Sequence, residues 1–306
     1  MRRKDGSLTS RAMLCTFSTS AYSGRKADKK ATREIREWHQ ITEEKVIEAK
    51  KRTFPEDAPS YKAITAIIGK GRDAFHEETL PWLQNGTGIL PAANFMHCTE
   101  RFNVLEREFY QALPAFFEEW PQLVEQAQGI LKTLFDPTDY PPLAKLKKRF
   151  SFGIKIFPMP DESDFRADIP DDQLDVIKIE MAANIENTVK QSMMEPYSQL
   201  WDAVAHMASR LQAQTTCPCR KCKGKTFKSD QFGDSLVENV AEVCERLPRL
   251  NLLADPKLDE MILVVKASLT TIAPDLLRGN EEVKKSLAER AQAIRDEMSV
   301  FFPSAA

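Results

Sequence analysis

The sequence predicts a mainly α protein, built as a helical bundle with a long projecting helical hairpin and a minor two-stranded β element. Only 11 of its 306 residues are glycine, and Lys, Glu, Ala and Leu are abundant, which favours helices. Over most of the chain, apolar residues recur three or four positions apart, the spacing of one helix face. Two short stretches alternate with a period of two instead, as half-buried strands do.

Residues 1–24 are expected to form a basic tail followed by the first strand. Between residues 12 and 21, Met13, Cys15 and Phe17 alternate with their neighbours in an imperfect period of two. The first 24 residues are also basic, rich in serine and nearly free of acid, as an organellar transit peptide would be. The alternation favours a strand over that alternative.

Residues 25–160 are expected to form a helical core that includes the second strand. A basic helix follows the turn at residues 23–24. A second helix follows Pro59 and ends at residues 79–82, where a proline interrupts the apolar spacing. The segment LQNGTGIL after it predicts a turn.

The longest predicted helix of this core begins at Pro91 and runs to Leu134. Pro114 and Pro121 are expected to kink it or to divide it into two shorter helices. Residues 149–156 then alternate with a period of two and predict the second strand. An isolated strand is marginal in water, so this strand is expected to pair with the first.

Residues 161–250 are expected to form the helical hairpin, whose arms are joined by TTCPCRKCKGKTFKSDQFG. The first arm begins near residue 171, and Pro196 is expected to bend it. The return arm is expected to begin at a capping box, Ser235–Glu238, and to end at Pro248.

Residues 251–306 are expected to form C-terminal helices that pack on the core. Asp255, followed by a proline, begins the first of them, and Asn280 begins the second.

Composition and motifs exclude several classes of protein. The formal net charge is only −2, and no apolar run is long enough to span a membrane. Six unevenly placed cysteines are too few for a secreted disulfide scaffold of this length, which favours a reducing cytoplasm. His76 and the two glutamates after it lack the second histidine of a zinc protease, and Gly69–Gly71 lacks the pattern of a phosphate loop. We therefore expect no enzyme; the alternative is an active site assembled from residues distant in sequence, which leaves no motif.

Three cysteines at the tip of the hairpin are candidate metal ligands. Cys217, Cys219 and Cys222 form C-x-C-x-x-C, and thiolates this close together can converge on one Zn²⁺. A fourth ligand is then needed. Cys244 is a poor candidate because it lies on an apolar stripe about 20 residues away, whereas His206 lies on the first arm. The alternative is an exposed, reducible or disordered tip without metal.

Three cationic segments suggest nucleic-acid binding. If the fold brought them together, they would form a groove along which a phosphate backbone could run, with Tyr22, Phe150, Phe152 or Phe227 available for stacking. The alternative is that lysine runs are ordinary solvated surfaces. The candidate nucleic-acid-binding residues are Arg25, Lys26, Lys29, Lys30, Arg33, Lys147, Lys148, Arg149, Arg220, Lys221, Lys223 and Lys225.

Three further segments carry a family resemblance: FSTSAYSGRKADKKATREI, HEETLPWLQNGTGILPAANF and FPMPDESDFR. From about Thr16 to Arg166 the chain resembles a family of bacteriophage proteins of unknown function, which are sometimes encoded beside MoxR-like AAA+ ATPases. The resemblance implies phage origin, the cytoplasm of a bacterial host and a helper role, and it supplies no catalytic residues. The CPCRKCKGK tip lies outside the shared pattern.

Two functions follow as expectations. The first is a non-enzymatic protein of phage DNA metabolism or DNA protection that associates with nucleic acid through its basic segments. The second is an adaptor or inhibitor whose hairpin docks a protein partner, either an AAA+ ATPase or a host factor. Neither expectation requires a membrane, and zinc is the one cofactor that the sequence suggests.

Overall fold

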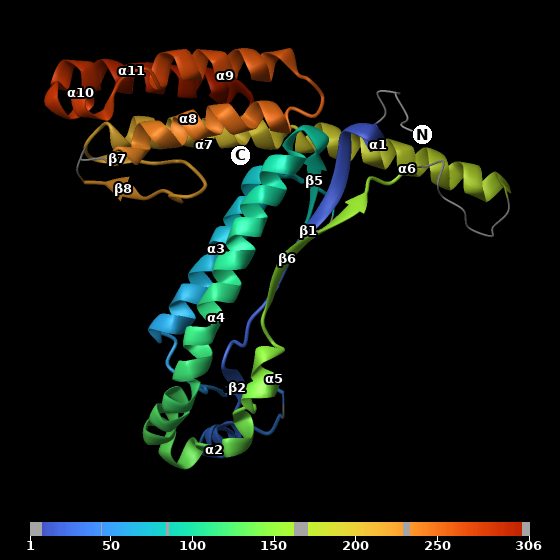
Figure 1. Ribbon diagram of the computed structural model, residues 1–306, viewed down its shortest axis with the longest axis vertical. Helices are drawn as coiled ribbons and strands as arrows, with labels where there is room; N and C mark the ends of the chain where they lie inside the picture. The colour runs from blue at the N-terminus through green and yellow to red at the C-terminus, as the bar shows by residue number, and fades with distance from the viewer. Residues whose placement is uncertain (1–7, 44, 84–85, 162–170, 229–232, 302–306) are drawn as a thin grey trace. The chain divides into compact units, whose positions relative to one another are not determined.

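A computed structural model confirms that the chain is mainly α, with minor β elements (Figure 1). The structure describes residues 8–43, 45–83, 86–161, 171–228 and 233–301. The chain forms two compact units. The larger unit contains Met1–Cys15, Glu78–Met96 and Ile156–Ala306, and the smaller unit contains Thr16–Glu77 and His97–Lys155. The predicted divisions at residues 24, 160 and 250 therefore differ from the observed ones.

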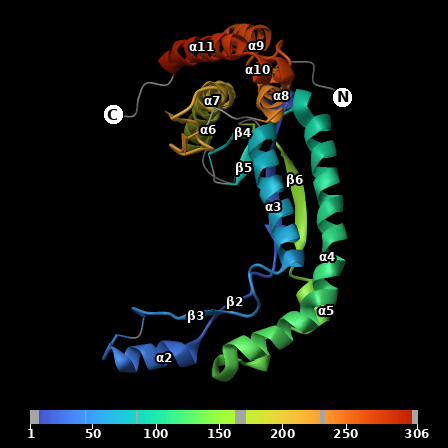
Figure 2. The same ribbon diagram turned by 90° about the vertical axis from the view of Figure 1, so that its left-hand side faces the viewer.

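Two long helices and a strand build the smaller unit. Helices α3 (Pro59–Glu78) and α4 (Phe95–Leu131) run side by side, next to strand β6 (Ser151–Pro158) (Figures 1 and 2). Aromatic rings fill the space between these elements. The ring of Phe17 meets that of Phe152 edge-on with centroids 4.9 Å apart, and rings from α3, α4 and the preceding loop continue the cluster. Short elements complete the unit, among them η2 (Lys132–Leu134), η3 (Pro137–Asp139) and α5 (Leu143–Lys147).

Of the two alternatives predicted for Pro114 and Pro121, a kink or a division into two helices, α4 agrees with the first. It is one helix with Pro114 and Pro121 inside, and it bends along its length (Figure 2). Each proline removes one backbone hydrogen bond. The helix nevertheless continues because Phe109, Phe116 and Trp120 bury one continuous face against the aromatic cluster.

A four-stranded sheet contains both predicted strands. Its order is β4-β5-β1-β6, so β1 (Ala12–Ser20) and β6 are neighbours as expected. The predicted turn after the second helix is instead a hairpin of β4 (Leu80–Pro81) and β5 (Thr87–Pro91). Four of the five residues of β5 are buried, so it shows no alternation from which the sequence could predict a strand.

A second antiparallel pair lies beside the basic helix of the smaller unit. Strand β2 (Arg25–Ala27) pairs with β3 (Lys50–Arg52), and α2 (Lys29–Trp38) follows β2. The side chain of Asp28 caps α2 by accepting a hydrogen bond from the backbone N–H of Ala31 at 2.9 Å.

The larger unit contains the hairpin and the C-terminal helices around one core. The first arm is divided into α6 (Asp171–Ser192) and α7 (Met194–Arg210), and α8 (Ser235–Leu250) returns. Although the sequence-based division places the C-terminal helices on residues 25–160, α11 (Glu281–Met298) packs on α7, and α9 (Pro256–Leu269) packs on α8 (Figure 1). Apolar side chains from all these helices meet in one cluster that includes Leu200, Val204, Met207, Val240, Leu247, Val265 and Leu287.

The helix ends of this unit agree only in part with prediction. The break in the first arm falls at Met193, so Pro196 stands in the first turn of α7, where its missing N–H matters least. Ser235 is already inside α8, whose N-cap has no side-chain cap, and the helix continues through Pro248. The caps at Asp255 and Asn280 are confirmed. A short helix, α10 (Pro274–Gly279), precedes α11.

Candidate metal centre

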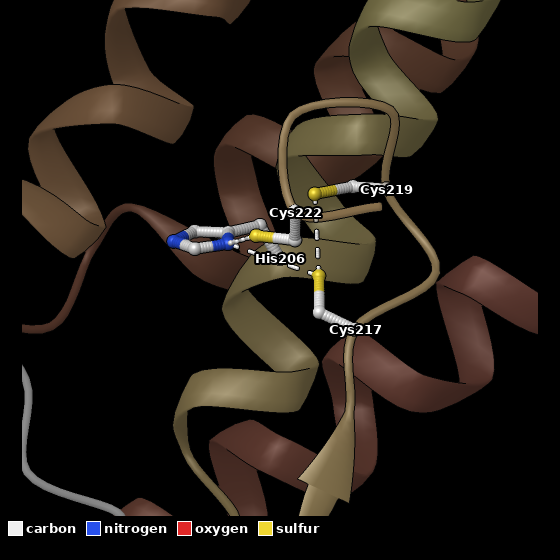
Figure 3. Close-up of side chains that lie close together, drawn as sticks. All are labelled: His206, Cys217, Cys219 and Cys222. Atoms are coloured by element: carbon white, nitrogen blue, oxygen red, sulfur yellow. Dashed lines mark hydrogen bonds between the residues drawn. The ribbon is translucent and has the colours of Figure 1, made fainter. Parts of the chain in front are cut away.

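The tip of the hairpin is a small β ribbon that folds back onto α7. Strand β7 (Thr215–Thr216) pairs antiparallel with β8 (Thr226–Phe227), and the hydroxyls of Thr216 and Thr226 are 2.9 Å apart. The three cysteines occupy the turn between these strands. His206 belongs to the C-terminal part of α7, and the cysteine side chains point toward its ring (Figure 3).

Backbone hydrogen bonds hold this turn in shape. The N–H of Cys217 donates to the carbonyl of Lys225 at 3.0 Å, and the N–H of Gly224 donates back to the carbonyl of Cys217 at 3.2 Å. The N–H of Cys222 donates to the carbonyl of Cys219 at 3.1 Å. Gly224 has φ +77°, a conformation that glycine adopts at little cost. Local backbone geometry therefore places the three cysteines on one side of the turn.

Four ligand atoms converge on one point. The Sγ atoms of Cys217 and Cys219 are 3.2 Å apart, and Nδ1 of His206 lies 3.3 Å from Sγ of Cys222 and 3.8 Å from Sγ of Cys217. All four atoms lie within 4.8 Å of one another (Figure 3). A tetrahedral zinc ion, with Zn–S near ~2.3 Å and Zn–N near ~2.0 Å, separates its ligand atoms by roughly 3.5–3.8 Å. The observed separations bracket that range.

The cluster is shielded from solvent. Cys217 and Cys219 are buried, with exposed fractions of 0% and 2%, and Cys222 is half-buried, so the expectation of an exposed, reducible tip is wrong for the first two. Burial raises the pKa of the Cys219 thiol to about 12 and also raises the pKa of Cys222. Thiols in this state are poor nucleophiles, which argues against redox or nucleophilic chemistry. A bound metal ion would reverse their protonation, because metals bind the thiolate.

His206 is suited to metal binding in its neutral form. Burial lowers the pKa of its imidazole, and the charges of Arg210 and Lys221 lower it further. Those two cations also matter for the metal-bound state. One Zn²⁺ with three thiolates and a neutral imidazole carries a net charge of −1, which the nearby cations offset.

Contacts outside the cluster fasten the tip to α7. The guanidinium of Arg220 forms a bidentate salt bridge with the Glu195 carboxylate, at 2.9 and 3.0 Å. The backbone N–H of Arg220 donates to the carboxylate of Asp202 at 2.9 Å. The ring of Phe227 meets that of His206 edge-on, with the Arg210 guanidinium 4.4 Å from the Phe227 centroid. The sequence pattern revealed the ligands but not Glu195 and Asp202, which belong to an otherwise ordinary helix surface.

The predicted basic segments are distributed over both units. Those of residues 25–33 and 147–149 lie in the smaller unit, and the tip lies in the larger. Arg220 was predicted to bind nucleic acid, but two carboxylates of α7 compensate its charge. Lys221, Lys223 and Lys225 are exposed.

The aromatic residues predicted for base stacking are a second correction. Tyr22, Phe150 and Phe152 are buried in the smaller unit, and Phe227 is covered by cations. Sequence reasoning missed Trp38, which is 82% exposed at the end of α2, more than the exposed rings of Tyr110 and Phe157. The sequence feature that could have revealed it is a tryptophan at the end of a helix whose other residues are mostly charged.

None of the helices within the described ranges combines the length and the apolar character needed to cross a bilayer. Comparison of the chain with protein-family models, with curated proteins and with solved structures finds no match.

Proposed function

We propose that this chain is a zinc-binding protein in which His206, Cys217, Cys219 and Cys222 hold one structural Zn²⁺. The observation that supports this most strongly is the convergence of four ligand atoms from two separate elements within 4.8 Å. Four protein ligands complete a tetrahedral shell and leave no open position for a substrate or water. The ion therefore has a structural role and not a catalytic one.

The donor set selects for zinc. Thiolate and imidazole ligands in tetrahedral arrangement suit Zn²⁺, whereas Ca²⁺ and Mg²⁺ prefer oxygen ligands. Iron–sulfur clusters most often use four cysteines, and the fourth position here is a histidine.

The ion would supply the stability that the tip lacks on its own. Each strand of the β7–β8 ribbon has two residues, and a short hairpin is at best marginally stable in water. Metal binding joins this ribbon to α7 through His206. The result is a rigid tip that presents Lys221, Lys223 and Lys225 in fixed positions.

Metal content of the purified full-length protein tests the proposal. Elemental analysis under reducing conditions should find about one zinc per chain. Replacement by Co²⁺ should give the visible absorption of a tetrahedral thiolate complex. Cys222→Ser removes one ligand and should lose the metal; Cys222 is chosen because it is the least buried of the three cysteines, so its replacement disturbs packing least. Cys244→Ser is the matched control, because Cys244 is a buried cysteine of the same unit outside the cluster.

Two results would refute the proposal: a wild-type protein that takes up no metal, or a Cys222→Ser variant that binds zinc as tightly as wild type. Nucleic-acid binding by the tip stays a prediction, now resting on three lysines without Arg220. Docking of an AAA+ ATPase or a host factor by the hairpin also stays a prediction.

A further inference from the structure

The β2–β3 ribbon of the smaller unit places like charges opposite each other. Arg25 is the register partner of Arg52, and Lys26 is that of Lys51. Like charges directly across an antiparallel pair destabilise it. In both strands the outer residues are exposed and the middle residue is half-buried, so Arg25, Lys50 and Arg52 share the exposed face.

Carboxylates of the protein offset only part of this charge. Lys51, on the inner face, lies 3.2 Å from Asp28 and 2.9 Å from Asp139. On the outer face, Arg25 and Arg52 share the carboxylate of Glu56, and Lys50 lies 3.1 Å from the carboxylate of Glu48, so two carboxylates face three cations. Residues 25–52 contain ten Lys or Arg against six Asp or Glu, whereas the whole chain has a net charge of −2. The outer face therefore keeps an excess of positive charge.

Helix α2 extends the same cationic surface. Lys29 and Arg33 are exposed and lie four positions apart on one stripe, which Lys30 adjoins; Arg36, three positions further along, is half-buried. The helix is fixed to the ribbon: the backbone N–H of Ala49 donates to the hydroxyl of Thr32 at 3.0 Å. Figure 2 shows α2 lying along the ribbon.

An exposed aromatic ring stands at the end of this surface. Trp38, the last residue of α2, is 82% exposed, and its ring centroid is 5.3 Å from that of His39. Leaving so large an apolar side chain in water forgoes a substantial hydrophobic contribution. A ring beside a row of cations is the combination that proteins use to stack a base while holding the phosphate backbone.

We infer that residues 25–52 bind single-stranded nucleic acid, with the phosphates on the outer cations of α2 and the ribbon and a base stacked on Trp38. The inference goes beyond the zinc centre and does not depend on it. A single strand fits better than a duplex because its bases are free to stack. An anionic membrane fits less well, since α2 has a charged stripe and one exposed ring instead of a broad apolar face.

Fluorescence anisotropy with labelled single-stranded oligonucleotides, over a series of salt concentrations, tests the inference on the full-length protein. Binding should weaken steeply with salt, and Lys29→Gln/Arg33→Gln should reduce the slope of log K against log salt by about 0.7 per lost contact. Trp38→Ala should weaken binding about 5- to 100-fold, and Trp38→Phe should restore most of it.

Two controls separate this site from other sources of binding. Lys285→Gln/Arg290→Gln removes the same charge from exposed positions of α11 in the larger unit and should leave binding unchanged. Replacing Lys221, Lys223 and Lys225 by Gln should also leave it unchanged. The inference would be overturned if the α11 control lost as much affinity as Lys29→Gln/Arg33→Gln. It would also be overturned if replacing the tip lysines alone abolished binding, or if Trp38→Ala bound as tightly as wild type. Binding to anionic vesicles without binding to oligonucleotides would do so as well.

Discussion

At the scale of single residues, two glycines of α3 differ in the space that a side chain would have. A Cβ on Gly71 would lie 2.7 Å from ring atoms of Phe17 and Phe152, whereas a Cβ on Gly69 would meet nothing within 4 Å. Gly71 is therefore needed for α3 to approach the aromatic cluster, and Gly69 has no such role. Sequence reasoning treated both as parts of a failed phosphate-loop motif.

Gly71→Ala should destabilise the protein by about 1–3 kcal/mol, the cost of overpacking a core. Gly69→Ala, the matched control in the same helix, should stabilise it by about 0.5–1 kcal/mol, because alanine is the better helix former. Denaturant unfolding of both variants measures the difference. Equal effects of the two substitutions would contradict the packing seen around Gly71.

The ion pair of buried Asp28 and half-buried Lys51 should make the stability of the protein depend on pH. The hydrogen bond from the Ala31 N–H, together with Lys51, lowers the pKa of Asp28 below its ordinary 3.8. Burial lowers the pKa of Lys51, but its bonds to Asp139 and Asp28 outweigh burial and raise it above 10.5. The pair therefore stabilises the fold between these values, and its contribution declines as pH falls through the lowered Asp28 pKa.

Asp28→Asn should cost about 1–2 kcal/mol at neutral pH, since Lys51 keeps Asp139 as a partner. The difference from wild type should shrink as pH falls below the ordinary Asp pKa of 3.8 and through the lowered pKa of Asp28. Denaturant unfolding at several pH values measures it. A difference that stays constant between pH 7 and pH 3 would show that charge is not the cause.

At the scale of elements, sequence patterns predicted the helices and strands whose apolar spacing is uninterrupted. Helices α3, α9 and α11 and the pairing of β1 with β6 agree with prediction. The β4–β5 hairpin was missed because β5 is buried on both faces. Local sequence left open whether α4 is kinked or divided at its prolines, because the choice depends on the tertiary packing of its buried face. The cysteines of the metal centre were found from spacing alone, since their backbone turn is local.

If the tip binds zinc as proposed, it should resist proteolysis until the metal is removed. Lys221, Lys223 and Lys225 are exposed sites for trypsin in a turn that the metal would hold in shape. Adding a chelator should therefore speed cleavage at these residues several-fold, and zinc should reverse the effect. Mass spectrometry of the fragments identifies the sites. Cleavage at Lys29 and Lys30 in α2 should keep its rate, and a general acceleration would indicate global unfolding instead.

At the scale of the whole molecule, the chain passes between its two units four times, at residues 15–16, 77–78, 96–97 and 155–156. Each unit nevertheless has its own core, one rich in aromatic rings and the other built from aliphatic residues of the hairpin and C-terminal helices. Sequence patterns could not predict this division, because it depends on which distant segments meet and not on local spacing.

Separate cores predict separable unfolding. Chelation should lower the melting temperature of the larger unit, which contains the proposed zinc ligands, and Gly71→Ala should lower that of the smaller unit. Differential scanning calorimetry should resolve two transitions that respond independently. A single transition shifted equally by both changes would mean that the units unfold as one.

The position of the metal ligands along the chain also bears on the order in which the protein assembles. All four belong to residues 206–222, before the first residue of α8. Closing so short a loop costs little entropy, and the backbone hydrogen bonds of its turn, together with the contacts of Arg220 to Glu195 and Asp202, all come from residues before α8. The ligand set is therefore complete on a ribosome-bound chain before the return arm has been synthesised. The chain can therefore bind zinc before it completes its fold. Helices α8, α9 and α11 then pack onto α7 after the cysteine turn has formed.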